Sequence, residues 1–141
     1  MSSSVLPELQ LFGEAYLVLV ALMLGSFINL AADRIPRGES VVQPRSHCRA
    51  CGRALNLIDL LPVLGYMLRG GRCATCRASI GAAAPVVEAA SGGLMAAAIL
   101  WLGLWPGAAL GLVLVSLLGL VVTGLALRPR RFARPTDEQP G

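Results

Sequence analysis

The sequence has no lysine, so all 12 of its basic side chains are arginines. Charged residues make up only 14 % of the 141 residues, and aromatic residues only 5 %. A typical soluble domain is about 25 % charged, so this shortage excludes an ordinary soluble domain. The few aromatic side chains are not interleaved with the arginines, and the chain therefore lacks a platform on which nucleic-acid bases could stack. We expect no nucleic-acid partner, although the formal net charge is +4.

Three long runs without charge dominate the chain instead. They cover residues 15–32, 89–105 and 107–127. About 20 helical residues cross a hydrocarbon core about 30 Å thick, and the second run reaches this length if its helix begins near Pro85. The sequence therefore predicts an all-α membrane protein with transmembrane helices at 15–32, 85–105 and 107–127. A signal peptide, the alternative for the first run, would need a basic start that this chain lacks.

The arginines are confined to residues 33–79 and to the stretch after residue 127. Positive side chains favour the cytoplasmic side of a membrane. The distribution predicts that residues 1–14 lie outside the cytoplasm, while residues 33–84 form a cytoplasmic head and residues 128–141 a cytoplasmic tail. The tail contains three prolines and no hydrophobic periodicity, so we expect it to be disordered.

All four cysteines lie in this predicted head, in two Cys-x-x-Cys pairs separated by 21 residues. The predicted metal ligands are Cys48, Cys51, Cys73 and Cys76. Two such pairs are typical of a structural Zn²⁺ site built from two zinc knuckles, in which four thiolates complete a tetrahedral shell. An iron–sulfur cluster, two disulfides and a thioredoxin-like redox pair are the alternatives. His47, beside the first cysteine, is interpreted as a surface residue.

Six short motifs follow one another along residues 20–95. They are Gly25-Ser26-Phe27-Ile28-Asn29, Arg34-Ile35-Pro36, Pro44-Arg45-Ser46-His47-Cys48-x-x-Cys51-Gly52, Asp59-Leu60-Leu61-Pro62-Val63-Leu64-Gly65-Tyr66, Arg72-Cys73-x-x-Cys76 and Pro85-Val86-Val87-Glu88. This order resembles the N-terminal, tetracysteine half of the type IV prepilin leader peptidases / N-methyltransferases. The resemblance implies a polytopic protein of the bacterial inner membrane that cleaves the leader of prepilins and pseudopilins. It also implies methylation of the new N-terminal residue with S-adenosylmethionine, the activity associated with the tetracysteine half.

The peptidase chemistry of that family uses two aspartates, the second in a Gly-x-Gly-Asp motif that these 141 residues do not contain. We therefore expect a stand-alone N-terminal half that works beside a separately encoded peptidase half, without aspartic endopeptidase activity of its own. Gly65 and Ala84 also depart from the family, which often has serine and tyrosine at these places.

Methylation of an amine requires a positioned methyl donor and a group that keeps the amine deprotonated. The candidates for this chemistry are Glu88, Asp33 and Arg72. Alternative roles are open, since Glu88 also suits the positive N-terminal end of the second helix, and Asp33 suits the interface beside Arg34. No glycine-rich nucleotide loop is present, so the cofactor is implied by the resemblance alone.

Two other hypotheses compete with an enzyme half. The chain could be a non-catalytic scaffold or substrate-docking subunit of a type IV pilus or type II secretion system, or an unrelated membrane protein with a zinc-binding head. Residues 54–68, between the two cysteine pairs, are too apolar for a free loop. We expect them to lie on the membrane face or to pack onto the helix ends.

Overall fold

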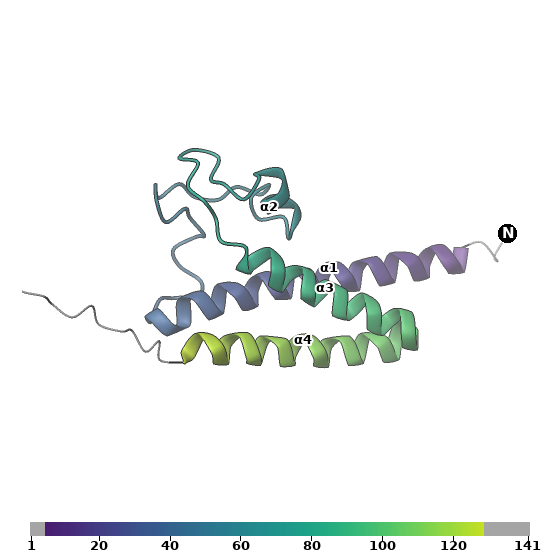
Figure 1. Ribbon diagram of the computed structural model, residues 1–141. Helices are drawn as coiled ribbons and strands as arrows, with labels where there is room; N and C mark the ends of the chain where they lie inside the picture. Colours follow the sequence, from purple (N-terminus) through teal and green to yellow (C-terminus); the bar gives the residue numbers. More distant parts are fainter. Residues whose placement is uncertain (1–4, 129–141) are drawn as a thin grey trace, which may run out of the picture.

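The computed structural model describes residues 5–128 of the chain. The helices are α1 (Val5–Arg34), the short 3₁₀ helix η1 (Ile35–Arg37), α2 (Leu64–Leu68), α3 (Ala83–Leu102) and α4 (Leu104–Leu127). Helices α1, α3 and α4 pack side by side as a bundle, and residues 38–82, called the head below, leave the bundle between α1 and α3 (Figure 1). The architecture is all-α, as predicted from the sequence.

Within residues 5–128, three segments are long and apolar enough to cross a membrane: Pro7–Arg37, Ala83–Leu102 and Leu104–Leu127. Their number and order confirm the predicted fold class. Helix α1 starts ten residues before the predicted boundary at residue 15, because the helix continues through its polar N-terminal end, where Gln10 donates a hydrogen bond of 3.0 Å to Glu14 one turn later.

The turn between the last two helices lies at Gly103, three residues before residue 106, which separates the two predicted helices. Gly103 has φ +81°, a conformation that glycine adopts without the steric cost other residues incur. Pro106 falls in the first turn of α4, where its missing N–H breaks no helical hydrogen bond. The predicted tail of residues 128–141 lies outside the described residues except for Arg128.

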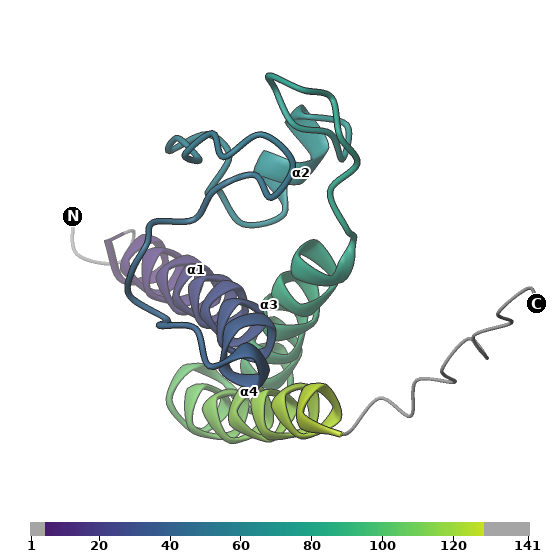
Figure 2. The same ribbon diagram turned by 90° about the vertical axis from the view of Figure 1, so that its left-hand side faces the viewer.

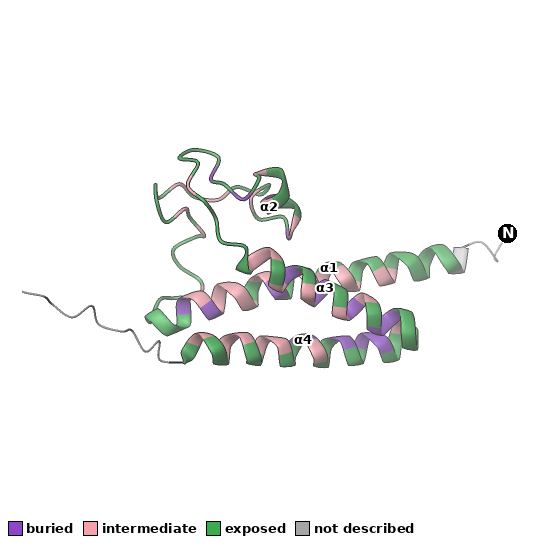
Figure 3. Cartoon of the chain, viewed as in Figure 1, coloured by how far each residue is buried: buried purple, intermediate pink, exposed green. Residues whose placement is uncertain are grey.

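The core of the bundle is small, and close helix contact replaces large side chains. Ala21, Met95, Ile99 and Val115 form its buried cluster. A Cβ on Gly107 would lie 2.5 Å from the Cα of Ile99, so α3 and α4 meet backbone to backbone. The outward sides of all three long helices carry exposed residues, many of them large and apolar (Figure 3). This distribution suits helices surrounded by lipid.

The head lies at the side of the bundle rather than beyond its end (Figures 1 and 2). Apart from α2, the described head consists of turns and loops with two isolated β-bridges, one between His47 and Ala54 and one between Arg72 and Ser79. In this position the head faces one side of α1 and α3. The candidate site lies between the head and these two helices.

Candidate functional site

The two Cys-x-x-Cys pairs form two turns of the same design. In the first, the Cys48 N–H bonds to Arg53 O at 2.9 Å, and in the second the Cys73 N–H bonds to Ala78 O at 2.9 Å. The residue after each pair has a left-handed backbone, with φ +71° at Gly52 and +60° at Arg77. Each turn therefore directs two thiols and several backbone N–H groups to one point, which is the geometry of a zinc knuckle.

The four predicted ligands meet at one place. All four Sγ atoms lie within 4.8 Å of one another, and the separations Cys48–Cys76 and Cys51–Cys73 are 3.7 and 3.9 Å. Tetrahedral coordination with Zn–S bonds of about 2.3 Å places sulfur atoms about 3.8 Å apart. All four cysteines are free of disulfides. The donor set therefore fits a single tetrahedral metal ion, and with four thiolates it leaves no open position for a substrate.

Backbone donors favour ionised thiols at this centre. The N–H groups of Cys76 and Thr75 lower the pKa of Cys73 to about 6, and those of Cys51 and Ala50 lower the pKa of Cys48. At Cys76 a backbone N–H lowers the pKa, but burial and the neighbouring thiols outweigh it and raise the pKa to about 11. Crowded thiolates thus repel one another, and a divalent cation would relieve that repulsion.

Asp59 is a charged residue of the head for which the sequence predicts no role, and in the structure it is the centre of an ion-pair cluster. Its carboxylate accepts hydrogen bonds of 2.6 Å from both Arg53 and Arg69, and a third bond from the Asn56 N–H at 3.1 Å. Burial raises the pKa of Asp59, but these donors outweigh burial and hold it at about 2. Arg53 also belongs to the first knuckle, where its carbonyl accepts from the Cys48 N–H, so Asp59 links the metal centre to the segment between the knuckles. The sequence did contain one signal for this role, because Asp59 is the one acidic residue in the apolar stretch of residues 54–68.

A cavity of about 550 Å³ separates the head from α1 and α3. All three predicted methylation residues, Asp33, Arg72 and Glu88, line it, so the fold brings them to one space. Four arginines and three acids line the cavity, and most of them pair with each other. Within residues 5–128, Arg72 is the lining arginine without an acidic partner, and Glu88 is the lining acid without a basic one.

Glu88 is only 7 % exposed and connects three parts of the chain. From its place in α3 it accepts a 2.6 Å hydrogen bond from Ser26 Oγ of α1 and a 2.7 Å bond from the Val63 N–H of the head. Val63 has φ +59° and ψ −50°, and the Leu64 N–H reaches Pro62 O, which defines a classic γ-turn. This turn is strained for a β-branched residue, so Glu88 holds the head in a conformation it would otherwise avoid.

The other two predicted residues are placed differently. Asp33 bonds to Arg37 one helical turn later at 2.7 Å and also pairs with Arg49 of the first knuckle, so it ties α1 to the head. Its side chain is 41 % exposed. Arg72 is exposed at the cavity edge, and its backbone pairs with Ser79 in the second knuckle.

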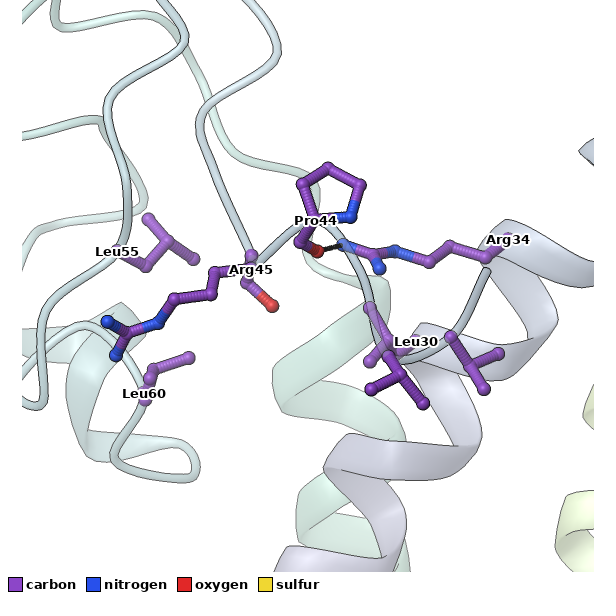
Figure 4. A pocket seen from close by; sticks show the side chains of 9 residues that line it. Leu30, Arg34, Pro44, Arg45, Leu55 and Leu60 are labelled. Atoms are coloured by element: carbon purple, nitrogen blue, oxygen red, sulfur yellow. Dashed lines mark hydrogen bonds between the residues drawn. The ribbon is translucent and has the colours of Figure 1, made fainter. Parts of the chain in front are cut away.

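A second, smaller cavity of about 210 Å³ lies behind the first loop of the head (Figure 4). Arg34, the last residue of α1, is buried there and donates to Ser40 O at 2.7 Å and Pro44 O at 2.8 Å. Arg45 extends away from it towards Leu55 and Leu60 (Figure 4). Arg34 therefore fastens the chain as it leaves the membrane helix, and this contact explains why an arginine ends α1.

Comparisons with known proteins agree with the motifs of the sequence. Residues 19–102 match the family described as Bacterial Peptidase A24 N-terminal domain. A prepilin leader peptidase/N-methyltransferase of Myxococcus xanthus is 36 % identical over 103 residues, covering 73 % of this chain and 31 % of the relative. Its counterpart in Bacillus subtilis is 35 % identical over 105 residues, covering 74 % of this chain and 42 % of the relative. No solved structure matches the chain.

The chain spans less than half the length of these curated relatives, and its residues 19–102, which match the family, include both cysteine pairs. The family match covers more than half of the chain and includes the metal centre, Glu88, the whole of α3 and the second half of α1. The resemblance predicted from the six motifs is confirmed: the chain belongs to the prepilin leader peptidase family, through its bacterial peptidase A24 N-terminal domain.

Proposed function

We propose that this chain takes part in prepilin processing as the part that methylates the mature N-terminus of a pilin or pseudopilin, with S-adenosylmethionine as methyl donor. The observation that carries the proposal is the cavity between the head and the bundle. It contains one buried carboxylate, Glu88, whose negative charge meets no cation within residues 5–128. The relatives from Myxococcus xanthus and Bacillus subtilis are named as N-methyltransferases as well as peptidases, which supports the same assignment.

Glu88 suits the task of holding and deprotonating an α-ammonium group. Its two present donors are neutral, and each carboxylate oxygen retains a second lone pair for a substrate N–H. Glu88 would take the proton of the α-ammonium group, and the bound donor would supply an electrophilic methyl carbon to the neutral amine, with the electron pair of the C–S bond leaving on sulfur. Arg72, exposed at the cavity edge, would hold an anionic group such as the carboxylate of the donor. Asp33, already paired with two arginines, would position the first knuckle.

The metal is proposed to be zinc, and its role to be structural. Four thiolates close the coordination shell, so no water or substrate is activated there. The ion would instead keep the two knuckles together, and through Arg53 and Asp59 it would fix the segment that covers the cavity.

We further propose that the protein lies in the bacterial inner membrane with its N-terminus outside and with the head and C-terminus in the cytoplasm. The distribution of arginines supports this orientation. Cleavage of the leader would require peptidase aspartates of the kind that the resemblance implies, and these would lie outside residues 1–141.

The test is methyl transfer from labelled S-adenosylmethionine to a pre-cleaved pilin peptide, with the full chain in liposomes. The reaction is run with and without a separately expressed peptidase half. Glu88→Gln removes the base but preserves both hydrogen bonds, so we expect loss of transfer with an intact fold. Glu8→Gln, an exposed acid of α1, is the matched control. If the Glu88→Gln variant transferred methyl groups at the wild-type rate, Glu88 would not be the base of the reaction.

A non-catalytic scaffold or docking subunit is the second candidate function. One observation favours it: both oxygens of Glu88 are already bonded within the protein, as expected of a purely structural carboxylate. No methyl transfer in either condition, with the metal bound and the helices intact, would establish this alternative.

A further inference from the structure

The segment of residues 60–68, which contains α2, has an unusual surface. It carries no charged residue, although Asp59 and Arg69 flank it. Its exposed side chains include Leu64 at 56 %, Met67 at 67 % and Leu68 at 69 %. A contiguous apolar surface of this kind marks contact with a partner or a membrane rather than with water.

Hydrogen bonds fix the depth of this segment relative to the membrane helices. The Val63 N–H bonds to Glu88, and Glu88 bonds to Ser26 of α1. Ser26 lies eight residues before Arg34, which places it about 12 Å inside the end of α1 at 1.5 Å per residue. Val63 and the start of α2 are therefore level with a residue inside the membrane-spanning segment Pro7–Arg37.

Other contacts agree with this depth. Gly65 and Tyr66 of α2 line the same cavity as Ser26 and Phe27 of α1. Figures 1 and 2 show α2 beside the bundle formed by α1 and α3, and not beyond the helix ends. The apolar surface of residues 60–68 thus lies at the same depth as part of the exposed apolar surface of the bundle.

The backbone of the segment is also suited to surroundings without water. An irregular chain is excluded from lipid when its N–H groups lack partners, because water cannot satisfy them there. Here six of the segment's eight N–H groups bond within the protein, and Pro62 has no N–H to satisfy. The bonded N–H groups are those of Leu60, Leu61, Val63, Leu64, Gly65 and Met67.

The flanking charges define the polar edge of the segment. Asp59 bonds to Arg53 and Arg69 on the knuckle side of the head, so the charged groups cluster together and the apolar side chains are left exposed. We propose that residues 60–68 are embedded in one leaflet of the bilayer beside α1 and α3, where Leu64, Met67 and Leu68 contact lipid acyl chains. The charged knuckles then lie at the headgroups, as in other interfacial segments.

The experiment uses tryptophan fluorescence of the full chain in lipid nanodiscs. Trp101 and Trp105 are exposed at the opposite end of the bundle, so both are first replaced by phenylalanine. Met67→Trp then reports from α2, and Ala74→Trp reports from an exposed position in the second knuckle. Lipids brominated on their acyl chains should quench the emission at position 67 strongly and shift it to shorter wavelength. The water-soluble quencher acrylamide should quench the emission at position 74 preferentially.

Two results would overturn the proposal. Equal quenching of positions 67 and 74 by acrylamide would place the segment in water. Protection of position 67 from both quenchers would show that protein covers it, such as a second copy of this chain. Bound metal and helical circular dichroism verify each variant, and Leu64→Trp replaces Met67→Trp if that variant does not fold. The readout involves no methyl transfer, so it is independent of the proposed function.

Discussion

The contact of Glu88 with Ser26 and Val63 is the most informative point to perturb. Glu88→Ala leaves the Ser26 hydroxyl and the Val63 N–H without their acceptor. A hydrogen bond to a charged group contributes about 1.5 kcal/mol at the lower end, so the two bonds contribute about 3 kcal/mol. Relaxation of the strained Val63 turn returns about 1 kcal/mol. The net loss of about 2 kcal/mol corresponds to a head that opens about 30-fold more often.

Amide hydrogen exchange in nanodiscs measures this opening directly. We expect the amides of residues 60–68 to exchange about 30-fold faster in Glu88→Ala, since exchange rates follow the opening equilibrium. Glu88→Gln should stay within about tenfold of the wild type, because its amide oxygen accepts from Val63 and its amide nitrogen donates to Ser26. Glu8→Ala, at an exposed position of α1, is the control. Unchanged exchange in Glu88→Ala would refute the docking role.

Three further predictions concern the head. Cys73→Ser should abolish stoichiometric zinc by elemental analysis and unfold the head, since metal binding supplies its folding energy. The pKa of Asp59 is about 2 against an ordinary 3.8, so its stabilisation of about 1–2 kcal/mol, allowing for solvent screening, is complete above pH 4 and is lost as the pH falls to 2. Asp59→Asn should therefore lower the melting temperature at pH 7 but not at pH 2. Arg77→Gly should slow metal loss to a chelator, because glycine removes a left-handed strain of about 1 kcal/mol that Gly52 already avoids in the first knuckle.

The bundle and the metal centre could be predicted from the sequence because their signals are local. Uncharged runs of 17 to 21 residues define the membrane helices, and the x-x spacing within each cysteine pair defines a knuckle. Both signals depend only on residues that lie close together in the sequence. The order of the six motifs then identified the family without any knowledge of the fold.

The position of the head could not be predicted in this way. Glu88 bonds to a side chain 62 residues earlier and to a backbone N–H 25 residues earlier, and neither partner carries a charge that would mark it in the sequence. The left-handed Val63 was equally hidden, since a β-branched residue is among the least expected at positive φ. The sequence indicated that Glu88 lies near the membrane. The fold shows that its carboxylate holds Ser26 and Val63.

The order of these parts along the chain has a consequence for biosynthesis. All four cysteines precede α3, whereas the carboxylate that fastens the head belongs to α3. A ribosome adds about 5–20 residues per second, so the metal loop is complete before Glu88 has been synthesised. The knuckles can therefore close around their ion first, and the insertion of α3 then delivers Glu88, whose carboxylate holds Val63 in its strained turn.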